Sequence, residues 1–138
     1  IVHRLDKTTS GLLILAKTKQ MADILSQQIR EHKIHKTYHA ILANARHLPP
    51  CGEWNDEIDG KTASTQYKIL SGNLVELIPI TGRKHQLRIH AAMHGAPILG
   101  DTRYTDIHNQ ADCIYLHCAK IEFEYENKKM IFESKESL

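Results

Sequence analysis

Apolar residues recur at helical spacing in one segment near the N-terminus. A helix is predicted over residues 19–32, with Thr18 at the N-cap position. Its apolar stripe, which we expect to pack in the core, consists of Met21, Ile24, Leu25 and Ile29. A second helix is predicted over residues 81–94, where Gly95 supplies a left-handed C-cap and Pro97 prevents continuation.

Short apolar or alternating segments predict β-strands elsewhere in the chain. The first, a continuous apolar run after a turn, is expected to be a buried strand. Two pairs form predicted hairpins, with turns at residues 71–73 and 126–128. The seven predicted strands are residues 11–16, 36–43, 64–70, 74–79, 114–118, 121–125 and 130–132. This pattern predicts an α+β fold, a largely antiparallel mixed β-sheet with flanking helices.

Length and composition indicate one soluble globular domain. The chain has 138 residues, 41% hydrophobic and 25% charged, which excludes a disordered polyelectrolyte or a fibre. The longest apolar run, residues 12–16, is far shorter than the roughly 20 residues of a membrane span, so no membrane partner is expected. The net charge of +2 is too small to indicate nucleic acid by itself.

The cysteines and histidines bear on redox compartment and metal binding. Three cysteines, an odd number without paired spacing, predict free thiols and a cytoplasmic protein. They are Cys51, Cys113 and Cys118. His90 and His94 stand four residues apart and His117 adjoins a cysteine, but neither group has the spacing of a structural zinc site. No metal site is expected, and a metal-dependent hydrolase stays an alternative that metal analysis would test.

Three segments carry candidate chemistry. Residues 3–11, H-R-L-D-K-T-T-S-G, place a carboxylate between cations before a turn, although a surface salt-bridge cluster would look the same. Residues 81–90, T-G-R-K-H-Q-L-R-I-H, crowd cations at a helix N-terminus, where the dipole disfavours them and an anion such as phosphate would explain them. Tyr38 lies on a basic strand, where packing is the ordinary role of a tyrosine.

Taken together, these segments resemble the pseudouridine synthases of the large-subunit ribosomal, RluA-like type. Residues 3–11 match the family pattern H-R-L-D-x-x-T-S-G, and residues 81–90 match T-G-R-x-H-Q-[IL]-R-x-H. Residues 95–104 are similar to G-x-P-I-x-G-D-x-x-Y, and residues 116–118 to L-H-A. The resemblance extends over residues 1–132, so it covers almost the whole chain.

The resemblance implies a role for five residues at matching positions. Asp6 would be the catalytic carboxylate, and Arg88 would pair with it. Arg4 would enter the RNA stack and fill the place of the flipped nucleotide. Tyr38 would lie against the uracil ring and assist proton transfer, and Leu116 would pack under the base.

Three further cations are candidates for contacts with the RNA backbone by charge and position alone: Arg83, Lys84 and Lys36. The implied reaction breaks the N1–C1′ bond of uridine and joins C5 to C1′, in ribosomal or transfer RNA. It involves neither redox change nor group donor, so no cofactor is expected. Whether Asp6 attacks as a nucleophile or removes a ribose proton is left open by the sequence.

The resemblance also implies differences from the complete family domain. Residues 1–138 correspond to one catalytic domain without the strands that precede the H-R-L-D motif and without an S4-type RNA-binding domain. An unpaired sheet edge at this point would favour a homodimer. A non-catalytic RNA-binding module and an inactive fragment of the synthase are the alternatives.

Overall fold

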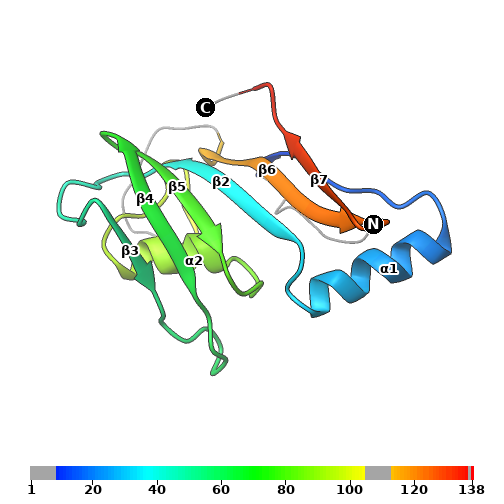
Figure 1. The fold of residues 1–138 in the computed structure, drawn as a ribbon. Helices are drawn as coiled ribbons and strands as arrows, with labels where there is room; N and C mark the ends of the chain where they lie inside the picture. Colours follow the sequence, from blue (N-terminus) through cyan, green and yellow to red (C-terminus); the bar gives the residue numbers. More distant parts are fainter. Residues whose placement is uncertain (1–8, 105–112, 137) are drawn as a thin grey trace.

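The computed structural model describes residues 9–104, 113–136 and 138. Within these residues the chain forms one seven-stranded sheet with two helices (Figure 1). In chain order the elements are β1 (Ser10–Gly11), α1 (Lys19–Arg30), β2 (His35–Ile41), β3 (Cys51–Trp54), β4 (Thr65–Ser71), β5 (Leu74–Pro79), α2 (Gln86–Met93), β6 (Leu116–Tyr125) and β7 (Lys128–Glu133). The predicted α+β class is confirmed.

The sheet has the order β1-β6-β2-β5-β4-β3, and β7 also pairs with β6. Every pairing is antiparallel except that of β1 with β6. The long strand β6 therefore has β2 along one edge, while β1 and β7 share the other. Helix α2 packs against β4 and β5, and α1 lies beside the far end of β6 (Figure 1).

The prediction of a buried strand over residues 11–16 is wrong beyond its first residue. Only Ser10–Gly11 pairs with β6 as a strand, and the chain leaves the sheet after the Leu12 N–H, which donates to the Cys118 carbonyl at 3.0 Å. Leu13 and Leu15 are 45% and 63% exposed, whereas the residues between and before them are partly buried. The strand stops because the next stretch of the β6 edge, from Lys120 onward, pairs with β7.

Helix α1 begins as predicted and ends two residues early. The Thr18 side chain accepts a hydrogen bond from the backbone N–H of Met21 at 3.1 Å, which is an N-cap. His32 takes a left-handed conformation with φ 57°, so the helix cannot continue to it. Of the predicted core stripe only Leu25 is buried, and Ile24 is 38% exposed.

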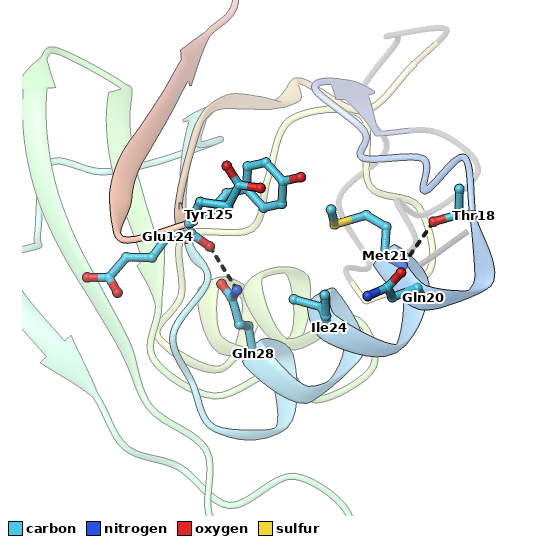
Figure 2. A pocket seen from close by; sticks show the side chains of 8 residues that line it. Thr18, Gln20, Met21, Ile24, Gln28, Glu124 and Tyr125 are labelled. Atoms are coloured by element: carbon cyan, nitrogen blue, oxygen red, sulfur yellow. Dashed lines mark hydrogen bonds between the residues drawn. The ribbon is translucent and has the colours of Figure 1, made fainter.

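Two of the other three residues of the stripe face a pocket rather than the core. Met21 and Ile24 line this pocket opposite Glu124 and Tyr125 at the end of β6 (Figure 2). The Gln28 side chain crosses to donate a hydrogen bond to the Glu124 carbonyl at 2.8 Å. Since α1 meets only the end of the sheet, it has too little sheet beneath it to cover its whole apolar face.

Helix α2 starts at Gln86, five residues later than predicted, and residues 81–85 form a loop before it. His85, at the N-cap position, has a left-handed φ of 56°. The helix ends at Met93, one residue before the predicted end, and His94 is its C-cap. Gly95 has φ 72°, and the N–H groups of Gly95 and Ala96 bond back to carbonyls of the last turn, which is the Schellman arrangement.

The number of strands is predicted correctly only because two errors offset each other: two predicted strands are one, and one strand was not predicted. Residues 114–118 and 121–125 are not separate strands, since residues 116–125 form the continuous strand β6. Strand β3 was not predicted, because Pro50 and Gly52 indicate a turn. Gly52 instead admits the Tyr67 ring, whose Cε1 would lie 2.9 Å from any Cβ placed there.

The core lies between the sheet and α2. Its fully buried large side chains include Trp54, Leu42, Leu77, Ile98, Ile121 and Val75. Neither helix among the described residues is long and apolar enough to cross a membrane.

Candidate active site

Arg88 on α2 forms a buried ion pair with Asp101. Its Nε donates to Oδ2 of Asp101 at 3.0 Å and its Nη2 to Oδ1 at 2.9 Å. Arg88 is 8% exposed and Asp101 is fully buried. The pair is bidentate, a geometry that fixes the plane of the guanidinium as well as its position.

Asp101 is held by the backbone of the turn that it begins. Its Oδ1 also accepts hydrogen bonds from the N–H groups of Arg103 at 3.1 Å and Tyr104 at 3.4 Å. Burial would raise the pKa of the Asp101 carboxyl, but the bonds from Arg88 and from these two amides outweigh it, and the pKa lies below its ordinary value. The carboxylate is therefore charged at neutral pH.

Tyr104 covers the face of the same guanidinium. The Arg88 Cζ lies 5.1 Å from the centre of the Tyr104 ring, within range of a cation–π contact. The Tyr104 hydroxyl and His85 Nδ1 are 2.5 Å apart, so the left-handed residue before α2 anchors the ring. Arg88 is thus held at its edge by Asp101 and on its face by Tyr104.

Tyr38 and Leu116 lie on neighbouring strands and share one face of the sheet. Leu116 is opposite Ala40 on β2, and Tyr38 is opposite Cys118 on β6, so all four side chains project to the same side. Tyr38 is 8% exposed and Leu116 is fully within the core. Burial raises the pKa of the Cys118 thiol, although a hydrogen bond with the Tyr38 side chain opposes the shift.

The three candidate phosphate contacts differ in exposure. Lys84 is exposed in the loop before α2. Arg83 is partly buried, and its Nε donates to the Thr62 carbonyl at 2.8 Å. Lys36 is also partly buried, two residues from Tyr38 on β2, and burial lowers the pKa of its ammonium group. Lys84 is the best placed of the three to meet a phosphate in solvent.

The buried side chain of Gln86, at the first position of α2, makes four hydrogen bonds to the neighbouring loop and strand. Oε1 of Gln86 accepts from the Thr81 hydroxyl at 2.5 Å and from the Arg83 N–H at 3.1 Å. Its Nε2 donates to the Ser64 carbonyl at 2.8 Å and to the Thr65 hydroxyl at 2.9 Å. The backbone N–H of Arg83, in the segment where the sequence suggests an anion, therefore already has an internal acceptor.

Arg4 and Asp6 lie outside the described residues, so the pairing of Asp6 with Arg88 stays a prediction. Asp101 occupies the edge of the guanidinium formed by Nε and Nη2. The hydrogens of Nη1 and the second hydrogen of Nη2 define another edge, where a second carboxylate can bind.

Asp101 and Tyr104 are the residues that sequence reasoning missed. Both belong to the G-D-x-x-Y stretch at residues 100–104, but no role was assigned to either. The signal was an acidic residue directly after a glycine in a matching motif. What the sequence does not give is the partner, which lies thirteen residues earlier on a helix.

The paired histidines of α2 have structural partners. Nδ1 of His90 lies 2.9 Å from the Thr65 hydroxyl and its Nε2 lies 2.8 Å from the Asp56 carbonyl. Nε2 of His94 is 2.5 Å from Oδ2 of Asp56, and this bond holds the pKa of that carboxyl below its usual range. These contacts fasten α2 to the segment after β3.

Comparison with known proteins identifies the family. A family model described as RNA pseudouridylate synthase matches residues 1–93. The dual-specificity RNA pseudouridine synthase RluA of Vibrio cholerae is 36% identical, over 89% of this chain and 58% of its own length. The ribosomal large subunit pseudouridine synthase C of Rickettsia bellii is 40% identical, over 75% of this chain and 41% of its own length.

Solved structures agree in fold. Human RNA pseudouridylate synthase domain containing 4 is 28% identical, with a TM-score of 0.83 over 97% of this chain and 70% of that one. Human RNA pseudouridylate synthase domain containing 1, at 23% identity, has a TM-score of 0.86 over 98% of this chain and 68% of that one. The chain spans about half the length of the curated relatives it matches. It belongs to the RNA pseudouridylate synthase family.

Proposed function

We propose that the protein is an RNA pseudouridine synthase, an isomerase that acts on a uridine in ribosomal or transfer RNA. Its relatives are named for action on large-subunit RNA and, in one case, for dual specificity. In this proposal Asp6 is the catalytic carboxylate, Arg88 pairs with it, and Tyr38 and Leu116 bind the base.

One observation carries the proposal beyond family membership. Arg88 belongs to the cationic motif of residues 81–90, yet its side chain is buried and is held by the buried carboxylate of Asp101. An arginine that neutralises RNA phosphates needs to reach the surface. A buried, oriented guanidinium is suited instead to holding a second carboxylate ionised in a site without water, because a nearby opposite charge favours the charged form.

The reaction fits side chains of these types. The target base must leave its stack, which costs a few kcal/mol. The planar guanidinium of Arg4 can stack in the gap, and Tyr38 offers an aromatic face to the flipped base, a contact worth about 1–3 kcal/mol. Asp6 then acts on the sugar or the base. The isomerisation balances within one nucleotide, so no cofactor takes part in this proposal.

The same proposal assigns the RNA backbone to surface cations. Lys84 and Arg83 lie together in the loop before α2, with Lys84 exposed. Lys36, which is partly buried on β2, is the third cation that we assign to the RNA backbone. The homodimer expected from the sequence stays a prediction, which sedimentation of the purified protein tests.

The test is to map pseudouridines chemically in RNA from cells with and without the full-length gene. We expect one or a few sites to disappear on deletion and to return when the wild-type gene is restored. An unchanged map, together with RNA crosslinked to the protein, would identify a non-catalytic RNA-binding module instead.

A further inference from the structure

We propose that Asp101 is a positioning residue of the reaction, which fixes the guanidinium of Arg88 in the orientation needed to hold the catalytic carboxylate. The inference rests on the proposed function, in which Arg88 pairs with Asp6. It assigns a role to a residue that does not itself touch the substrate.

The geometry of the ion pair supports this role. Asp101 binds the edge of the guanidinium formed by Nε and Nη2, at 3.0 and 2.9 Å. Because the group is planar and rigid, holding this edge also sets the direction of the remaining hydrogens of Nη1 and Nη2. One arginine can therefore bind two carboxylates, Asp101 on this edge and a second carboxylate on the other, which in the proposed function is that of Asp6.

Asp101 is itself anchored and cannot easily follow a moving arginine. The N–H groups of Arg103 and Tyr104 both bond to its Oδ1. The preceding Gly100 has φ 89°, and a Cβ there would lie 1.8 Å from the Cys113 carbonyl oxygen. The turn that carries Asp101 is thus pressed against the segment leading into β6.

Tyr104 restricts the guanidinium in the remaining direction. Its ring covers Arg88 at 5.1 Å, and its hydroxyl meets His85 Nδ1. The ring blocks rotation of the guanidinium out of the plane that Asp101 sets. The arginine is therefore held by contacts from the loop before α2 and from the turn after Asp101.

Stability alone does not account for this arrangement. Removing two charges from water costs several kcal/mol for each ion, and the attraction between them only about offsets the cost. Apolar side chains of similar volume would hold α2 against the turn at least as well. A precisely oriented charge in a dry site is instead what a transition state with developing charge requires.

The test uses the full-length protein with Asp101→Asn, which keeps the shape but removes the charge. We expect the single-turnover rate, measured by tritium release from C5-labelled uridine RNA at saturating enzyme, to fall about 100-fold. RNA affinity should stay within about twofold, since Asp101 is buried away from the phosphates. A purely structural role would lower the folded fraction without lowering the rate per folded molecule.

Asp56→Asn is the matched control. It weakens the pairing of a carboxylate with His94 on the same helix, but it does not touch Arg88. We expect some loss of melting temperature and a single-turnover rate within about twofold of wild type. Should Asp101→Asn fail to fold, Tyr104→Leu removes both the ring beside the guanidinium and the hydroxyl bound to His85, whereas Tyr104→Phe removes the hydroxyl alone. The rate should fall about tenfold in Tyr104→Leu and stay closer to wild type in Tyr104→Phe.

Arg88→Met separates this inference from the proposed function. Loss of turnover in Arg88→Met with a wild-type rate in folded Asp101→Asn or Tyr104→Leu would overturn the positioning role alone. Full turnover by Arg88→Met would overturn the catalytic part of the proposed function. Loss of turnover in both Arg88→Met and Asp101→Asn, with RNA binding retained, is the expected result.

Discussion

Replacing Gln86 with leucine should destabilise the protein more than any other single glutamine change in the described residues. Gln86→Leu keeps the approximate size of the side chain but removes an acceptor and a donor. Four groups then lose a partner: the Thr81 hydroxyl, the Arg83 N–H, the Ser64 carbonyl and the Thr65 hydroxyl.

The expected loss can be worked from the burial of those groups. Thr81 and Arg83 are partly exposed, so water replaces much of what they lose. Thr65 is fully buried but keeps its bond with His90, and the partly buried Ser64 carbonyl keeps the hydrogen bond from the Ile80 N–H. A buried polar group left without a partner costs about 1–3 kcal/mol, and a group that keeps one partner costs less. The free energy of unfolding should therefore fall by about 2 kcal/mol, which lowers the melting temperature by roughly 7 °C.

Urea denaturation and thermal melting of both proteins measure this loss. Gln66→Leu is the matched control, because Gln66 lies on β4 next to Thr65 with its side chain exposed. Its effect should stay within about 0.5 kcal/mol. A loss below about 1 kcal/mol for Gln86→Leu, with the helix content unchanged, would refute the claim that Gln86 fastens the loop before α2.

Three further predictions concern other parts of the molecule. Gly11→Ala should lower the free energy of unfolding, measured by urea titration, by more than about 2 kcal/mol, because φ is 110° and a Cβ would lie 2.3 Å from the Cys118 carbonyl oxygen. Gly82→Ala is the control and should be nearly neutral, since a Cβ there would meet open space. Because the pKa of Asp101 is lower in the folded protein, the unfolded chain binds a proton on this carboxyl more readily, and the carboxylate stabilises the fold above about pH 4 but not below it. In Asp101→Asn the free energy of unfolding should therefore fall less steeply on acidification than in wild type. An equally steep fall would contradict the assignment. Lys84→Ala should reduce the slope of log K against log salt for RNA binding by about 1, and an unchanged slope would show that this lysine makes no phosphate contact.

Local features of the fold were predictable because their causes lie within a few residues. The start of α1 follows from the Thr18 cap, and the end of α2 follows from the left-handed Gly95. The hairpin of β6 and β7 turns at Glu126 and Asn127, both with positive φ, close to the predicted position.

Features that depend on distant partners were not predictable from local patterns. An apolar run after residue 11 favours a strand, but β7 already occupies the edge of β6 that it would need. In strand β3, Gly52 lies opposite Tyr67 and leaves room for its ring, a contact across the sheet that the local sequence pattern does not indicate.

The candidate site also has some features that local sequence indicates and others that depend on distant contacts. The strand pairing puts Tyr38 and Leu116 on one face of the sheet, while their roles in the site, which the motifs imply, stay predictions. The carboxylate of Asp101 beside Arg88 is a tertiary contact between a helix and a turn. Nothing in the spacing of these two residues indicates it, since the intervening chain ends a helix and reverses direction.

We propose that the Asp6 carboxylate performs the isomerisation, and Asp6→Asn in the full-length protein tests this role most directly. Tritium release from C5-labelled uridine RNA should fall to background, while the melting curve stays close to wild type and RNA binding persists or tightens, because a negative charge near the phosphates has been removed. Substantial turnover by well-folded Asp6→Asn protein would contradict the claim.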